Sequence, residues 1–261
     1  MTRSFDDTLT ALEALVARCA ADGDRRGYFA AMYLAVTRTV RDRVEHGTFA
    51  DGVRMRMFVA AFAGRYLAAD EAWRAGRPAP AAWSAAFDAA SQRRPIILQH
   101  LLLGMNAHIN LDLGVTASEL AVDGSLDAVR QDFDAVNDVL GALVDGCEAA
   151  LGKVSPWIRL ADHVGGGGDE TLIRFSLVEA RRQAWATAVR LAGLDGEARV
   201  RAIDAVDATA TRVARYVTHP GPAGSAVLLL VRARERAAPA TVMDVLANVR
   251  PLPVPDAPRS R

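Results

Sequence analysis

Cysteines and long apolar runs are scarce in this chain of 261 residues. Only two cysteines occur, Cys19 and Cys147, and neither belongs to a Cys-x-x-Cys pair. These are too few for a disulfide-stapled secreted scaffold, and their spacing argues against a structural zinc or redox motif. No stretch approaches the roughly 18–20 apolar residues that span a bilayer, and the charged N-terminus lacks the apolar core of a signal peptide. We therefore expect a cytoplasmic protein without a membrane partner.

An excess of charge of either sign is also missing. The chain carries 31 basic and 31 acidic side chains, so no net positive field is available to hold phosphates. This excludes a strongly basic nucleic-acid binder. Hydrophobic residues make up 51% of the sequence and charged residues 24%, which excludes a disordered chain. We expect a globular protein, monomeric or homodimeric, whose partner is a small molecule.

Helical periodicity, in contrast, runs along nearly the whole chain. Bulky residues recur at every fourth position from Tyr28 to Val44, which places one buried stripe on a helix. Ser4 and Asp7 have the spacing of a capping box at the start of the first helix. The pattern predicts helices over residues 5–21, 28–45, 53–69, 96–113, 126–151, 170–191 and 197–217, and a short one around residues 83–87.

The pattern shows neither an internal repeat nor a clear domain boundary. It predicts an all-α fold, a single-domain bundle of about eight to ten helices over residues 1–250, followed by a proline-rich tail over residues 251–261. Residues 225–237 fit either a helix or an edge strand, because their apolar run is short. The four glycines from Gly165 to Gly168 predict a flexible lid or a plain connector.

The most informative element is the helix predicted over residues 96–113. It is apolar enough to be buried at the centre of the bundle, yet it carries six polar side chains. At about 100° of rotation per residue, His100, Gly104, His108 and Asp112 form one slanting row. A different face of the same helix holds the three amides of Gln99, Asn106 and Asn110.

Two glycines, one within this helix and one directly after it, affect its shape. Gly104 removes side-chain bulk between the two histidines, and it leaves room for a small ligand or for another backbone. Gly114 is expected to stop the helix, and Thr116 and Glu119 then have capping-box spacing for another short turn.

The row of polar groups suits acid–base chemistry. Each group buried without a partner would cost about 1–3 kcal/mol, so the row must be satisfied by itself, by other helices or by a bound species. Asp112 can orient the imidazole of His108 and raise its pKa, which would make His108 a general base. We therefore predict a small-molecule enzyme whose catalytic residues are His108, Asp112 and His100. The predicted substrate-binding residues are Asn106, Asn110, Gln99, Gly104, Tyr33, Arg65 and Arg182.

Arginines on neighbouring helices predict that the substrate is anionic. The planar guanidinium suits carboxylate, phosphate or sulfate groups and keeps its charge when buried. At least one of five arginines should point inward beside His108 or Asn110; the alternative is that all five are solvated or paired with nearby acids. The five are Arg54, Arg56, Arg65, Arg181 and Arg182.

Two other functions stay open. No cofactor is favoured, but a metal-dependent hydrolase could hold a divalent ion with His100, His108, Asp112 and His163. His100 and His108 lie about 12 Å apart along one helix, so such a site needs ligands from elsewhere in the chain. The third hypothesis is a non-catalytic helical binding protein, in which the polar helix only fixes the packing.

The stretch Gln99–Gly114, QHLLLGMNAHINLDLG, resembles the signature of a bacterial family called domain of unknown function 5995. Residues Phe29–Tyr33, Arg65–Leu67 and Glu179–Trp185 resemble other helices of that family, and the likeness covers residues 5–195. The resemblance implies an all-helical bacterial protein but brings no reaction. The family is also associated with natural-product pathways, such as aziridine ring closure in azinomycin-type biosynthesis, where an amine displaces a sulfate ester. This implies a cyclase of secondary metabolism, with no residue here assigned to that activity.

Overall fold

The computed structural model describes residues 4–121, 126–158 and 177–250. These residues form eleven α-helices and one π-helix, and they contain no strand, which confirms the all-α prediction. The elements are α1 (Phe5–Asp22), α2 (Gly27–Glu45), α3 (Gly52–Arg74), α4 (Ala81–Ala90), α5 (Ile97–Met105), η1 (Asn106–Leu113), α6 (Gly114–Leu120), α7 (Leu126–Val154), α9 (Leu177–Ala192), α10 (Gly196–Thr218), α11 (Gly221–Arg234) and α12 (Pro239–Ala247).

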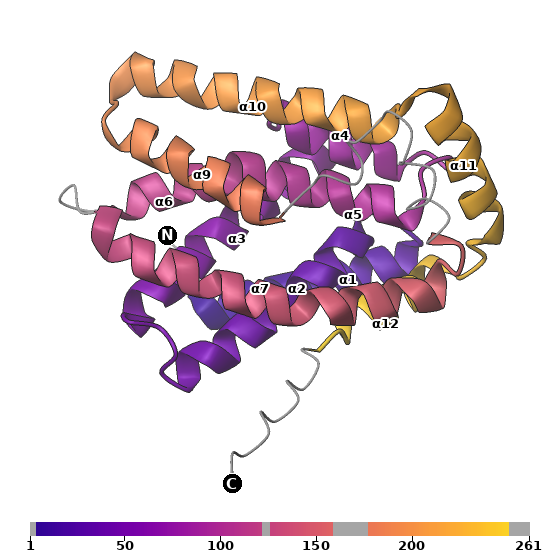
Figure 1. Ribbon diagram of the computed structural model, residues 1–261, viewed down its shortest axis with the longest axis horizontal. Coiled ribbons are helices and arrows are strands. Elements are labelled where there is room, and N and C mark those ends of the chain that lie inside the picture. Colours follow the sequence, from indigo (N-terminus) through magenta and orange to yellow (C-terminus); the bar gives the residue numbers. More distant parts are fainter. Residues whose placement is uncertain (1–3, 122–125, 159–176, 251–261) are drawn as a thin grey trace, which may run out of the picture.

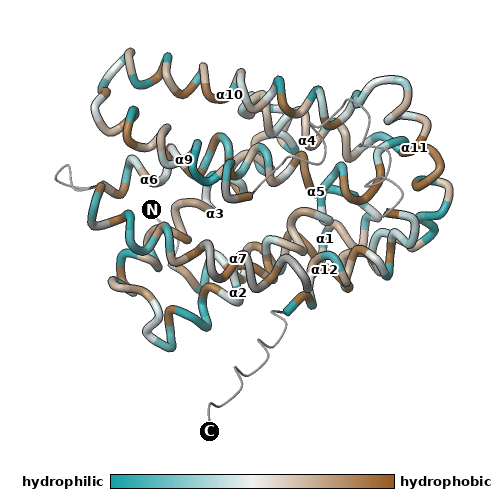
Figure 2. Tube along the Cα trace, viewed as in Figure 1, coloured by the Kyte–Doolittle hydropathy of each residue, from teal (hydrophilic) through white to brown (hydrophobic). Residues whose placement is uncertain are grey.

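The elements α5, η1 and α6 follow one another directly and form the centre of the bundle (Figure 1). The π-helix η1 packs against α9, α10, α3 and α4, while α2 packs against α1, α7 and α12. Figure 2 shows hydrophilic and hydrophobic residues alternating along helices such as α10, as expected where one face of a helix is buried. The predicted buried polar helix at the centre is therefore present.

Local signals at the N-terminus act as the sequence predicts. The Ser4 hydroxyl accepts a hydrogen bond from the Asp7 amide at 3.1 Å, and the Asp7 carboxylate accepts one from the Ser4 amide at 3.2 Å. This reciprocal pair is a capping box, and it begins α1. The stripe from Tyr28 to Val44 is buried in α2, except for the half-buried Val36.

The prediction that Gly114 stops the central helix is wrong. The chain passes from η1 into α6 at Gly114, and Thr116, which was expected to cap a new turn, is buried inside α6. A Cβ atom at Gly114 would lie 2.6 Å from the carbonyl oxygen of Ala184 in α9. The glycine therefore serves the close approach of α9 to the central helix, and not a helix end.

The C-terminal part of the chain is also helical. The ambiguous segment at residues 225–237 forms most of α11, and α12 was not predicted. The loop from Gly165 to Gly168 and the tail at residues 251–261 lie outside the described residues. No helix within the described ranges is long and apolar enough to cross a bilayer.

Candidate functional site

The polar motif coincides with a change of helix type. Residues Asn106–Leu113 form a π-helix between two α-helical segments. Hydrogen bonds in a π-helix run from residue i to residue i+5, and such segments occur often at functional sites. The predicted rotation of about 100° per residue therefore does not hold here, although the two polar faces remain distinct.

One face of the polar helix is tied to the backbone of α10. The Asn106 amide donates to the Ala210 carbonyl at 2.8 Å, and the Gln99 amide donates to the Val217 carbonyl at 2.6 Å. The Asn110 amide in turn donates to the Asn106 side-chain oxygen at 2.9 Å. These three amides were predicted to bind substrate. In the structure Gln99 and Asn106 join the polar helix to α10, and Asn110 supports Asn106 from within the same helix, because buried amides without partners would be costly.

The other face holds a chain of three polar side chains. Nδ1 of His108 lies 3.4 Å from Oδ2 of Asp112, and the indole N–H of Trp83 donates to the same oxygen at 2.9 Å. All three side chains are buried. The distance between His108 and Asp112 is longer than an ideal hydrogen bond.

Burial decides the charge of His108. It lowers the pKa of the imidazole, and the hydrogen bond and charge of Asp112 oppose this shift without cancelling it. The expectation that Asp112 would raise the pKa of His108 above its usual value is therefore wrong, because desolvation is the larger effect. His108 is neutral at pH 7, and its Nδ1 proton faces Asp112. Nε2 then carries a free lone pair, and no described residue is its hydrogen-bond partner.

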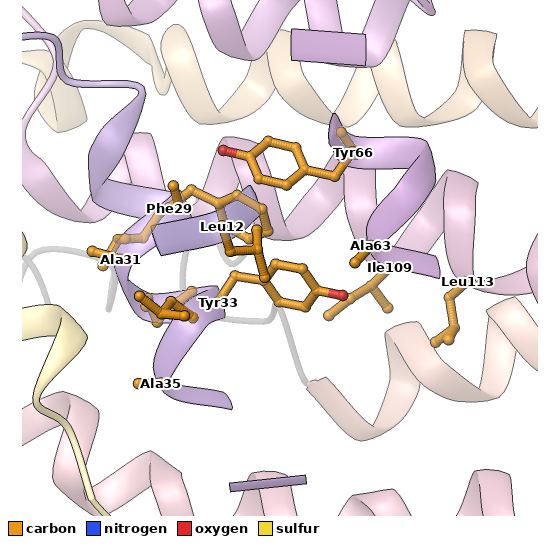
Figure 3. Packing of buried hydrophobic residues seen from close by; sticks show 14 of the residues in the cluster. Leu12, Phe29, Ala31, Tyr33, Ala35, Ala63, Tyr66, Ile109 and Leu113 are labelled. Carbon is orange, nitrogen blue, oxygen red and sulfur yellow. The ribbon is translucent and has the colours of Figure 1, made fainter. Parts of the chain in front are cut away.

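Aromatic side chains hold the His108 ring in place. Phe62 stacks on it with ring centroids 3.6 Å apart, and Tyr33 meets it edge-on at 4.4 Å. The Tyr33 hydroxyl is buried and has no hydrogen-bond partner among the described residues. In Figure 3, Tyr33 extends from α2 with its hydroxyl on the side of Ile109 and Leu113. His108 Nε2 and the Tyr33 hydroxyl are thus two unsatisfied polar atoms in an aromatic environment.

A cavity of about 440 Å³ lies beside these two side chains. Its walls come from α2, α3, α5, η1, α7 and α9 and consist mainly of Leu, Val, Met, Ile and Phe side chains. This size and this composition are typical of sites for small apolar molecules. The polar residues in its lining are Tyr33, Thr37, Arg54, His108, Asp132, Glu148 and Arg181.

Two of the five predicted arginines line this cavity. Arg54 pairs with Asp132 at 2.7 Å, and the buried Arg181 donates to the Phe133 carbonyl and stacks on the Phe133 ring. The others lie elsewhere: Arg182 is largely exposed beside Glu179, Arg65 pairs with Glu119, and Arg56 is exposed. Arg65 and Arg182 were predicted to bind substrate, but surface acids hold them away from the cavity.

His100 belongs to a different part of the molecule. It lines a separate cavity of about 10 Å³, enough for one water molecule at most. Burial, with the charges of Arg25 and Arg232, lowers its pKa to about 3. The space predicted beside Gly104 is filled by Phe29, whose ring would lie 2.3 Å from a Cβ atom there. The structure therefore does not bring His100 or Gly104 into the site of His108.

The predicted metal ligands are likewise not brought together. No three His, Cys, Asp or Glu side chains within the described residues are grouped so that they could hold a metal ion. His100 and His108 line different cavities, and His163 lies outside the described residues.

Sequence analysis missed two residues that position His108. Trp83 holds the Asp112 carboxylate, and Phe62 stacks on the imidazole. A signal for Trp83 exists, because a tryptophan in a short apolar helix needs an acceptor for its indole N–H once it is buried. The position of Phe62 depends on how α3 crosses the polar helix, which the sequence does not indicate.

The polar helix and its neighbours match a known family model. The model, described as a family of unknown function (DUF5995), matches residues 5–220. The chain belongs to this family. The match runs from α1 through α10, so it includes both partners of the Asn106–Ala210 hydrogen bond. Searches of the curated proteins and of the solved structures found no match.

Proposed function

We propose that this protein is an enzyme that binds a mainly apolar small molecule in the 440 Å³ cavity and uses His108 as a general base. One observation carries the proposal. Nε2 of His108 is a buried acceptor without a partner among the described residues, and its ring lines the cavity. A buried nitrogen in this condition is costly unless a ligand uses it.

The surroundings of His108 favour proton abstraction. A neutral imidazole accepts a proton at Nε2, and the Asp112 carboxylate beside Nδ1 stabilises the imidazolium that forms. Trp83 fixes the carboxylate, and Phe62 fixes the ring plane. The Tyr33 hydroxyl, on the same cavity wall, can donate a hydrogen bond to a developing negative charge.

Cyclisation by sulfate displacement is a narrower form of this proposal. There, a substrate amine would attack the carbon that bears the sulfate ester, the carbon–oxygen bond would break, and His108 would take the amine proton. Arg181 and the Asp132-paired Arg54 at the cavity wall are guanidinium groups of the kind that bind an anionic group. Its only other support is what the sequence resemblance implies, which assigns aziridine formation to no residue of this chain.

The test is a search for a consumed metabolite. The purified protein and a His108→Gln variant are incubated with an organic-solvent extract of bacterial cells, and the mixtures are compared by mass spectrometry. We expect a compound that the native protein converts and the variant does not. His219→Gln, the same change at an exposed histidine, is the matched control and should convert it normally.

A second candidate is a non-catalytic binding protein, which the predominance of apolar lining favours. The same experiment separates the two functions. A compound that copurifies with the native protein and is never converted, in any extract, would overturn the enzyme proposal and support binding alone.

A further inference from the structure

The lining of the cavity beside His108 extends a long way along the bundle. Its lining on α7 forms one stripe from Val129 to Leu151, which corresponds to about 33 Å at 1.5 Å per residue. On the central helix, the lining extends from Leu98 to Leu113. A compact, rounded ligand would not need walls of this length.

Contacts at opposite ends of α7 show which elements lie at the two ends of the cavity. At one end, Arg54 at the start of α3 pairs with Asp132. At the other end, the buried Glu235 carboxylate accepts hydrogen bonds from the Ile97 amide at 3.1 Å and from the Ser155 hydroxyl at 2.7 Å. The cavity therefore extends between the start of α3 and the start of α5.

The two ends differ in chemistry. The end at α3 contains Arg181, which is 5% exposed, and Arg54 with its paired Asp132, so two cationic side chains there face one carboxylate. The end at α5 is lined by Leu98, Leu101 and Leu102 of α5 and by Leu151 of α7, with the exposed Glu148 of α7 nearby, so this end has no cationic side chain in its lining. His108 and Tyr33 lie between the two ends. A ligand that fits has one anionic end and a long apolar remainder.

We infer that the ligand is an elongated aliphatic molecule with an anionic head, such as an acyl or isoprenoid chain that ends in a carboxylate. Its head lies beside Arg54 and Arg181, and its tail lies against Leu98, Leu101 and Leu151. This inference rests on the proposed function, since it names the substrate class of the same cavity. A substrate of this shape presents an interior position of its chain to His108.

Chain length is the first measurement. Titration calorimetry compares octanoate with dodecanoate, both below their micelle-forming concentrations. Each buried methylene group strengthens binding about two- to fourfold, so dodecanoate should bind at least tenfold more tightly. Cholate, an anion with a wide, rigid apolar body, should bind at least tenfold more weakly than dodecanoate. Equal affinity for octanoate and dodecanoate, or tighter binding of cholate, would overturn the inference.

A variant that fills the tail end provides the structural control. Cys147, half-buried in α7, lines the cavity, and Cys147→Trp should reduce the difference between the two chains to about twofold or less. Leu229→Trp makes the same kind of change at an exposed position and should leave the difference intact. If Cys147→Trp does not fold, the smaller change Leu151→Phe replaces it. If the folded variant keeps the full difference in affinity between octanoate and dodecanoate, the aliphatic chain of the ligand does not lie beside Cys147.

The head group and the source of the chain are tested with matched ligands. Dodecanoate should bind about tenfold more tightly than dodecanol, and Arg181→Met should remove this preference while Arg181→Lys keeps it. Equal binding of acid and alcohol by the native protein would overturn the position of the head. Farnesoic acid has a branched chain of the same main length. Tighter binding than dodecanoate would indicate an isoprenoid chain, and weaker binding would indicate a fatty-acyl chain.

Failure of this inference is distinguishable from failure of the proposed function. Binding of dodecanoate that is equal in the native protein and in His108→Gln, without conversion of any metabolite, leaves the chain inference standing and removes catalysis. If the protein converts a compact metabolite but binds no long-chain acid, the enzyme proposal stands and the chain inference fails.

Discussion

The two faces of the polar helix contain similar numbers of buried polar groups, but their hydrogen bonding differs. On the amide face, formed by Gln99, Asn106 and Asn110, the side chains of Gln99 and Asn106 donate hydrogen bonds to backbone carbonyls of α10. On the imidazole face, His108 has one nitrogen near Asp112 and the other without a described partner, beside a cavity. The comparison teaches that burial of a polar group does not by itself mark a functional site. A functional site is indicated instead by a buried polar group that lacks a hydrogen-bond partner and borders a cavity.

The largest effect on stability is expected on the amide face. Asn106→Ala removes the bond to Ala210 and leaves the Asn110 amide without its partner, at a cost of about 2–3 kcal/mol in the free energy of unfolding. Urea unfolding measures this cost. Asn248→Ala, which removes an exposed asparagine bonded within its own helix, is the control and should change stability by less than about 0.5 kcal/mol. Equal, small costs for both variants would contradict the structural role of this face.

Acid should destabilise the protein through its buried histidines. The pKa of His100 is about 3 in the folded state, against about 6.5 when unfolded, so the unfolded state takes up the proton first as the pH falls. Stability is then fully present above about pH 6.5 and decreases as the pH falls toward 3. Between pH 7 and pH 5, His100 alone accounts for about 2 kcal/mol. The lowered pKa of His108 acts in the same direction.

Urea unfolding at both pH values checks this prediction. The loss of stability between pH 7 and pH 5 should be smaller in His100→Gln than in the native protein, whatever the stability of the variant at pH 7. If the two proteins lose the same amount, His100 is not buried in its neutral form.

Gly104 tests whether the space between the histidines is filled. Gly104→Ala places a methyl group against the Phe29 ring and should cost about 1–2 kcal/mol through overpacking. Gly64→Ala is the matched control, since nothing lies within 4 Å of a Cβ atom at this position in α3. There the same change should raise stability by about 0.5–1 kcal/mol. Thermal unfolding of the pair measures both, and a stabilising effect at Gly104 would mean that Phe29 leaves space for a ligand.

Much of the fold could be predicted because local signals decide it. The every-fourth-residue stripe of α2 and the capping box at Ser4 depend only on spacing along the chain. The π-helix, in contrast, cannot be predicted from helical periodicity, because its hydrogen-bond register differs from that of an α-helix. The partner of a buried amide depends on where another helix crosses. The sequence could therefore predict that Asn106 is buried, but not whether its hydrogen-bond partner is a substrate or the backbone of α10.

The same limit applies to the candidate site. His108 and Asp112 were predicted as a pair from their four-residue spacing, and they do lie together. The direction of the His108 pKa was predicted wrongly, because the sequence shows the neighbouring carboxylate but not the degree of desolvation. The cavity follows from tertiary packing alone, and so does the choice of Asp112 as the acceptor for the Trp83 indole.

The smallest effect on stability, and the sharpest contrast, is expected on the imidazole face. His108→Gln should change the free energy of unfolding by less than about 0.5–1 kcal/mol, or increase it, because the native ring holds an unsatisfied nitrogen in an apolar environment. Glutamine keeps an amide group near Asp112 and retains most of the side-chain volume. Urea unfolding beside Asn106→Ala gives the direct comparison of the two faces. A loss of about 3 kcal/mol in His108→Gln would show that His108 serves packing as the amides do, and the enzyme proposal would lose its central observation.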